Sequence, residues 1–313
     1  KAVSAKAEGE ACVDYMGPDG AGHYVKMVHN GIEYADMQMI ADTYFVMKNV
    51  LGMTAEEMAD TWETWNKGEL SSYLVEITAR ILRKADEMTG KPLVDVILDV
   101  AKQKGTGRWT SMSALALGVP APTITEAVFA RTMSSQKEER LVLSERYRDL
   151  AFEGAELDRP AVLEDLRQAL YASKICAYAQ GFNLLEEAGK VYGWDLQMGR
   201  IAKIWRSGCI IRACFLDTVS EIFEKENGMT NLLASGYFSQ VLYGARAGWG
   251  RIISLAVKRG TAVPALSSAL AYFDSYRTAR GSANLLQAQR DCFGAHTYER
   301  IDKEGAFHTD WMN

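Results

Sequence analysis

Apolar residues recur every three or four positions over most of this 313-residue chain, which is the period of an amphipathic helix. Alternating runs of β-branched residues are scarce, and only six prolines occur. Thr54 followed by Glu57 has the spacing of a capping box at a helix start. We therefore predict an all-α protein. The expected helices cover residues 24–51, 55–65, 70–86, 124–133, 161–192, 196–205 and 210–225, and the helical pattern continues to about residue 271.

A weak internal repeat suggests how these helices are organised. A Trp-x-x-Gly turn and an apolar segment follow Gly52 at Trp65 and follow Gly193 at Trp205. The repeat predicts a large duplicated helical bundle over residues 1–280, with related halves near 20–140 and 165–275. From residue 281 to 313, glycines separate several aromatic residues that favour burial. We expect this segment to be an irregular C-terminal tail that packs on another surface.

Composition limits the class of protein. The net charge of −5 gives no general attraction to nucleic acid or to an anionic membrane. The most apolar stretch, residues 232–257, contains Arg246 and Arg251, so we predict no transmembrane helix. Five scattered cysteines without a Cys/His cluster favour reduced thiols in a cytoplasmic protein and no metal site.

The strongest candidate for chemistry is one face of the first predicted helix. Lys26, His29, Asn30 and Glu33 follow the spacing i, i+3, i+4, i+7 and therefore share a helix face. This face holds a possible base, a possible acid and two hydrogen-bonding groups. A solvated polar stripe is an equally good reading of the spacing alone. The preceding glycines at 17, 20 and 22 are better read as a tight turn than as a dinucleotide loop, because no strand–helix–strand pattern surrounds them.

Further basic and polar residues suggest an anion site. Residues 104–110 read as a loop in which Lys104 and Thr106 stand among glycines. Arg131 lies in an apolar helix, where it either faces a buried anion or pairs with a nearby carboxylate. Arg290 and His296 lie six residues apart in the tail, and a surface pair or a packed histidine is the alternative. Together these residues predict a cationic pocket for a small, phosphorylated ligand in an acidic protein.

At these positions the chain resembles a known family. Gly20-x-Gly22-x-x-x-Lys26-x-x-x-Asn30 is similar to the signature of the β-hydroxyacid dehydrogenase superfamily. Longer blocks resemble 6-phosphogluconate dehydrogenase (decarboxylating) and occur in family order. They cover residues 17–33, 103–110, 118–120, 126–131, 284–299 and 307–311.

The resemblance implies oxidation of 6-phospho-D-gluconate with NADP, giving ribulose 5-phosphate and CO2 in the pentose phosphate pathway. It implies Lys26 as general base, expected to be buried among Val25 and Met27, and Glu33 as the acid that protonates carbon 1. Substrate-binding roles carry over to His29, Asn30, Tyr34, Lys104, Thr106, Arg131, Arg290 and His296.

The resemblance also implies a homodimer in which the tail, with Arg290 and His296, completes the partner subunit's site. Family members carry an N-terminal nucleotide-binding domain that has no counterpart in residues 1–16. We expect NADP to be held mainly by that domain and the isolated chain to show no turnover. Two alternatives stay open: a non-catalytic helical dimerisation module, and a related β-hydroxyacid dehydrogenase domain with another substrate.

Overall fold

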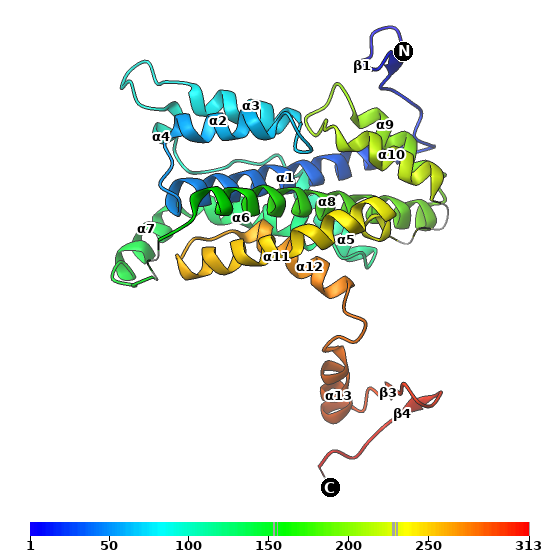
Figure 1. Cartoon of the computed structure of the whole chain (residues 1–313). Helices are drawn as coiled ribbons and strands as arrows, with labels where there is room; N and C mark the ends of the chain where they lie inside the picture. Colours follow the sequence, from blue (N-terminus) through cyan, green and yellow to red (C-terminus); the bar gives the residue numbers. More distant parts are fainter. Residues whose placement is uncertain (153, 155, 227–228, 230, 313) are drawn as a thin grey trace. The chain divides into compact units, whose positions relative to one another are not determined.

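The computed structural model describes residues 1–312 except 153, 155, 227, 228 and 230 (Figure 1). The chain divides into two compact units, Lys1–Leu270 and Ala271–Asn313. Two long helices form the centre of the first unit: α1, Ala21–Asn49, and α8, Arg159–Tyr192. They run antiparallel, because Ile32 lies against Gly181 while Asp36, further along α1, pairs with Lys174, further back on α8. A Cβ at Gly181 would lie 2.4 Å from Ile32 Cδ1, so glycine is what permits this close crossing.

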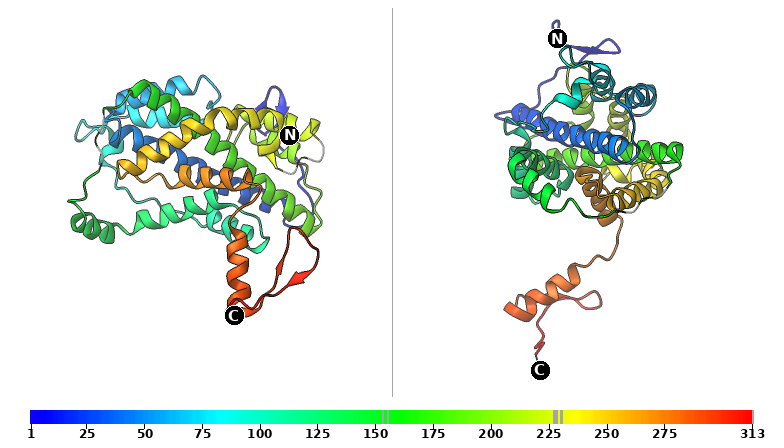
Figure 2. Two further views of the ribbon diagram at one scale, coloured as in Figure 1. Left: turned by 60° about the horizontal axis from the view of Figure 1, so that its bottom comes forward. Right: turned by 90° about the vertical axis from the view of Figure 1, so that its left-hand side faces the viewer.

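Several other helices of the first unit pack around this central pair (Figure 2). α11 packs on α8, whereas α5 and α6 pack on α1. Two helical pairs, α2 with α3 and α9 with α10, form the remaining layer seen above the central helices in Figure 1. The further elements are β1 (Lys6–Ala7), β2 (Glu10–Ala11), α2 (Ala55–Trp65), α3 (Tyr73–Arg83), α4 (Leu93–Val96), α5 (Thr106–Ala116), α6 (Pro122–Ser135), α7 (Lys137–Arg146), α9 (Met198–Trp205), α10 (Phe215–Lys225), η1 (Leu232–Ala234), α11 (Gly236–Lys258) and α12 (Pro264–Tyr276).

The segments that follow the two Trp-x-x-Gly turns meet each other. Ser72 and Ala213 form an isolated antiparallel bridge. The N–H of Tyr73 donates to the carbonyl of Arg212 at 3.0 Å, and the N–H of Cys214 donates to that of Ser71 at 2.9 Å. Each segment leads directly into a helix, α3 or α10. This pairing accords with the weak repeat, and the division into two related halves stays a prediction.

The all-α class is confirmed. α2 occupies the predicted residues, and its Thr54–Glu57 capping box is present in both directions. The prediction of a loop over 104–110 is wrong, because α5 begins at Thr106. Within the described residues, no helix has the length and apolar character needed to cross a membrane.

The second unit is more regular than the irregular tail we predicted. It contains α13, Ala283–Gly294, followed by an antiparallel pair of β3, Tyr298–Glu299, and β4, Ala306–Phe307. We missed this helix because the prediction followed the scattered glycines and aromatic residues of the segment and not the helix-forming residues 283–292. Ala295 caps the C-terminus of α13 with a left-handed backbone, at a φ of 50°.

Candidate functional site

The polar face predicted on α1 is a connected cluster. Lys26 Nζ lies 3.2 Å from His29 Nδ1, which lies 3.0 Å from Asn30 Oδ1. The carboxylate of Glu33 is 3.9 Å from the same His29 nitrogen. These contacts connect the amine, the imidazole, the amide and the carboxylate along one side of the helix, over the two turns from Lys26 to Glu33.

His29 is the buried centre of this cluster. Its side chain is 1% exposed, and its ring meets Trp205 of α9 edge to face at 5.6 Å. Burial lowers the pKa of His29 to about 4, the charge of Lys26 lowers it further in the same direction, and the Asn30 hydrogen bond opposes them. The imidazole is therefore neutral near pH 7. Its buried Nε2 has no hydrogen-bond partner among the described protein atoms.

Glu33 and Arg131 form the next part of the site. The Arg131 guanidinium from α6 lies over the Tyr34 ring at 3.6 Å from its centre. Burial raises the pKa of Glu33, while Lys26 and Arg131 lower it and Asp36 raises it. Burial likewise lowers the pKa of Arg131. Both groups are half-buried, so the face combines an acid that holds its proton more tightly with a positioned cation.

The N-terminus of α5 is placed against α1 by close packing. Gly105 precedes the helix with a φ of 99°, a backbone conformation that favours glycine. A Cβ at Gly107 would lie 2.5 Å from the Tyr34 ring, so only glycine lets the first turn approach that ring. The Thr110 hydroxyl lies 2.9 Å from the carbonyl of Met27, which fixes α5 to α1.

This helix start suits an anion. The first N–H groups of α5 have no intrahelical acceptor, and no side chain caps them. Thr106 is the first residue of the helix and Lys104 stands exposed just before it. Arg131 also contacts the segment just before α5, with its Nη1 3.5 Å from the carbonyl of Lys102. Lys104, Thr106 and Arg131, predicted from separate parts of the sequence, thus border the region where α5 and α6 pack on α1.

One expectation for a site residue differs from the structure. Lys26 is exposed, whereas we expected it to be buried among Val25 and Met27. The contacts of Trp205 and Thr110 were not predicted as part of the site. Trp205 carried a signal only as part of the repeated turn, and Thr110 lay in the segment mistaken for a loop.

Arg290 and His296 belong to the second unit. Both side chains are exposed. Arg290 is on α13 and contacts Gln287 Oε1 at 3.3 Å, and the His296 ring meets Phe293 edge to face at 5.9 Å. Their predicted role in a neighbouring subunit's site stays a prediction.

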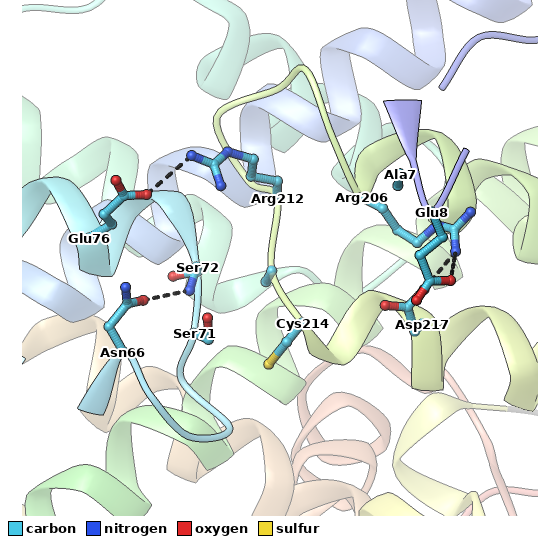
Figure 3. A pocket seen from close by; sticks show the side chains of 11 residues that line it. Ala7, Glu8, Asn66, Ser71, Ser72, Glu76, Arg206, Arg212, Cys214 and Asp217 are labelled. Atoms are coloured by element: carbon cyan, nitrogen blue, oxygen red, sulfur yellow. Dashed lines mark hydrogen bonds and ion pairs between the residues drawn. The ribbon is translucent and has the colours of Figure 1, made fainter. Parts of the chain in front are cut away.

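A separate polar pocket of about 220 Å³ lies beside the Ser72–Ala213 bridge (Figure 3). Its charged groups already pair: Arg212 with Glu76 at 3.2 Å, and Arg206 with Asp217 at 2.7 Å. None of the predicted site residues lines it. The pocket therefore gives no support to another location for the chemistry.

Comparison with known proteins shows the family of the chain. Residues 22–311 match the family model described as 6-phosphogluconate dehydrogenase, C-terminal domain. The chain belongs to this family. The 6-phosphogluconate dehydrogenase domain described here includes every candidate residue named above, since all lie between 22 and 311.

Relatives with assigned activities are similar over the whole chain. An NADP(+)-dependent, decarboxylating 6-phosphogluconate dehydrogenase of Bacillus subtilis (strain 168) is 57% identical over 100% of this chain and 66% of its own length. An NAD(+)-dependent enzyme of the same organism is 51% identical over 99% of the chain, again covering 66% of that relative. This 6-phosphogluconate dehydrogenase domain therefore spans just under two thirds of the curated relatives it matches.

A solved structure has the same fold. The Plasmodium falciparum 6-phosphogluconate dehydrogenase, studied in its apo form, with its cofactor NADP+ and with its substrate 6-phosphogluconate, matches with a TM-score of 0.96 at 42% identity. The match covers 98% of this chain and 66% of that one.

Proposed function

We propose that this chain supplies the substrate-binding and catalytic helical part of an enzyme that converts 6-phospho-D-gluconate to ribulose 5-phosphate and CO2 with NADP. The observation that carries the proposal is the row Lys26, His29, Asn30 and Glu33 on α1, with Arg131 beside it, in a member of this family. The relatives' activities support the substrate and the reaction class. We propose that the protein works as a homodimer in the cytoplasm.

In this proposal Lys26, as the neutral amine, takes the proton of the substrate's 3-hydroxyl while carbon 3 is oxidised. The resulting ammonium donates to the new 3-keto oxygen, which accepts electron density as the carboxylate leaves as CO2. The ring hydrogen of His29 changes its position with the charge of Lys26. A charged Lys26 donates to Nδ1 and leaves the ring hydrogen on Nε2, whereas the neutral amine lets Nδ1 carry the hydrogen and donate to Asn30 Oδ1.

Glu33 is the proposed acid for the last step. It lies seven residues beyond Lys26, two turns along the same face, and gives a proton to carbon 1 of the enediol. Burial favours its protonated form, which suits this role. Asn30, His29 and Tyr34 are the proposed partners of the substrate's hydroxyl and carboxylate groups.

The phosphate is assigned to the cationic end of the site. Arg131, Lys104 and the first turn of α5 at Thr106 offer a guanidinium, an ammonium and free N–H groups. Arg290 and His296 are proposed to reach the phosphate of the substrate that is bound to the partner subunit.

The described residues do not fit a complete NADP site. The strands present in the described part of the chain form two antiparallel two-residue pairs, so the parallel strand–helix–strand unit that cradles a dinucleotide is not found there. We therefore propose that NADP is held mainly by protein outside this sequence and that the isolated chain has no turnover. In this proposal the chain contributes the groups that transfer protons and the residues that bind the substrate.

Calorimetric titration of the chain with 6-phosphogluconate, and with gluconate as the ligand lacking phosphate, tests the proposal. We expect the phosphorylated ligand to bind and gluconate to bind at least tenfold more weakly. Lys26→Met should weaken the binding of both ligands. Arg131→Ala should remove the preference for 6-phosphogluconate over gluconate. Arg300→Ala, an exposed arginine paired with Asp302, is the control and should change neither. Equal binding of both ligands by the unmodified chain would refute the assignment of the phosphate end.

A further inference from the structure

Asp291 organises the second unit through hydrogen bonds to four separate groups. Its side chain lies on α13 and is inaccessible to solvent. Oδ1 accepts from the N–H of Thr297 at 2.9 Å and lies 2.9 Å from His308 Nδ1. Oδ2 accepts from the N–H of Thr309 at 3.0 Å and from Trp311 Nε1 at 2.8 Å. One carboxylate thus ties the helix, both sides of the β3–β4 segment and the end of the chain together.

This arrangement requires a charged acceptor. Burial by itself raises the pKa of Asp291, but the bonds from His308, Trp311, Thr309 and Thr297 outweigh it and hold the pKa well below the usual range. A carboxylate offers two oxygens with about four acceptor sites, and a neutral amide of the same shape offers only one oxygen. The four donors therefore match the ionised side chain and do not match asparagine.

The backbone on both sides of His296 adopts a conformation that it would not choose alone. Ala295 has a φ of 50° and Thr297 a φ of 61°. Both lie in the left-handed region, which residues other than glycine, asparagine and aspartate rarely occupy. Asp291 holds both: its carbonyl accepts from the N–H of Ala295 at 2.9 Å, and its carboxylate accepts from the N–H of Thr297. Gly294 is close enough that a Cβ there would meet the His296 ring at 2.8 Å.

Apolar packing gives this unit little help. Phe293 is 75% exposed and Trp311 is 44% exposed. A segment of this size has too little buried apolar surface to impose one conformation. The polar network around Asp291 is thus the main source of order in the part of the chain that carries Arg290 and His296.

We propose that Asp291 is a positioning residue that presents Arg290 and His296 as a preformed anion-binding pair. Arg290 precedes Asp291 on α13, and His296 lies between the two left-handed residues that Asp291 fixes. The inference rests on the proposed function, because the substrate's phosphate is the anion. The tail is ordered before ligand arrives, so binding does not have to order it.

The first test measures order without ligand. Backbone amide exchange is compared between the parent chain and Asp291→Asn, with Asp302→Asn as a matched control, since Asp302 is an exposed carboxylate of the same unit that pairs with Arg300. We expect slow exchange at Thr297 and Thr309 in the parent and in the control, and exchange at least tenfold faster in Asp291→Asn. Unprotected amides in the parent, or unchanged protection in Asp291→Asn, would overturn the proposal.

A second variant separates positioning from general loss of structure. Ala295→Gly in the Asp291→Asn background removes the cost of the left-handed backbone without restoring the charge. We expect it to return part of the protection at Thr297 and part of the affinity for 6-phosphogluconate, which Asp291→Asn should reduce about tenfold while leaving gluconate unchanged. No rescue of either property would contradict the role assigned to Asp291.

Arg290→Ala distinguishes the two proposals. If it abolishes the preference for the phosphorylated ligand while the Thr297 and Thr309 amides stay protected, the tail binds phosphate and Asp291 orders it. If it leaves that preference intact, the tail does not bind the phosphate, and the positioning role of Asp291 is refuted as well. If Arg290→Ala removes the preference and Asp291→Asn does not weaken it, the function stands and the positioning role is refuted.

Discussion

Lys174 on α8 forms an ion pair with Asp36 on α1, and each of the two side chains is 1% exposed. The Lys174 ammonium also lies 5.6 Å from the centre of the Tyr178 ring and 5.8 Å from that of Phe215. Asp36 Oδ1 has no partner among the described protein atoms, so the pair is not fully compensated. The two central helices are thus joined by charge at a position three residues from the proposed acid Glu33.

Removal of one partner of this pair should be far more costly than removal of both. Lys174→Met leaves a buried carboxylate alone, and we expect it to lower the free energy of unfolding by about 3–5 kcal/mol. The double variant Lys174→Met/Asp36→Leu should recover much of that loss, because it leaves no unpaired charge. Urea unfolding of the chain measures both.

The control for this prediction is Lys225→Met, which breaks an exposed pair with Glu221 one turn away. We expect a loss of about 0–1 kcal/mol there. Similar losses for Lys174→Met and Lys225→Met would show that the buried pair contributes no more than a surface one.

Gly31 should tolerate no side chain where α1 crosses α5. A Cβ at this position would lie 2.6 Å from Thr110 Cγ2 and 2.8 Å from Thr110 Oγ1. We expect Gly31→Ala to lower the free energy of unfolding by about 1–3 kcal/mol, although alanine is the better helix former. Gly244→Ala on α11 is the matched control, because open space surrounds it, and it should stabilise by about 0.5–1 kcal/mol. If thermal unfolding shows Gly31→Ala to be more stable than Gly244→Ala, α1 and α5 are not packed this closely at Gly31.

The sequence predicted the α1 face because its information is local. Lys26, His29, Asn30 and Glu33 share a face through helix geometry alone, so their convergence needed no knowledge of the rest of the fold. The same geometry does not say how far the face is covered, which is why Lys26 was expected to be buried and is exposed. Periodicity fixes the direction of a side chain, whereas its exposure depends on what packs above it.

Other parts of the site depended on contacts between distant segments. The stacking of Arg131 over Tyr34 joins α6 to α1, and no local pattern announces it. α5 was missed because Gly105 and Gly107 are typical of loops. In the structure Gly105 is the residue just before the helix, and Gly107 in its first turn makes room for the Tyr34 ring. The Asp36–Lys174 pair was not predicted for the same reason, because its two partners lie on helices far apart in the sequence.

Asp42 should make stability fall as pH rises. It accepts from the N–H groups of Ala265 at 2.8 Å and Leu266 at 3.1 Å and from Gln38 Nε2 at 2.8 Å. Burial nevertheless raises its pKa to about 7, from an ordinary value of 3.8. The folded chain then binds more protons than the unfolded chain between these pH values, so the free energy of unfolding decreases as pH rises from about 4 to about 7.

Asp42→Asn should remove this contribution. Urea unfolding at several pH values measures the free energy of unfolding of the parent and of Asp42→Asn. Across that interval the parent should lose stability relative to Asp42→Asn by about 1.4 kcal/mol per pH unit. Asp149→Asn, an exposed carboxylate, serves as the control and should show no such trend. A constant difference between parent and Asp42→Asn would mean that Asp42 is ionised throughout.

His29 should act in the opposite sense over an overlapping range. Its pKa of about 4 lies below the ordinary value of 6.5, because burial and Lys26 disfavour the imidazolium. Between these values the unfolded chain binds more protons than the folded chain, so His29 makes stability rise with pH and then level off above about 6.5. His29→Gln should remove that rise, which the contribution of Asp42 partly masks in the parent.

The double comparison separates the two groups. In the Asp42→Asn background, the free energy of unfolding should increase from pH 5 to pH 6.5, and adding His29→Gln should flatten the curve. His23→Gln, an exposed histidine at the start of the same helix, should leave the curve unchanged. A flat curve in Asp42→Asn alone would show that His29 takes up protons equally in both states, and that the neutral imidazole assigned to the site is wrong.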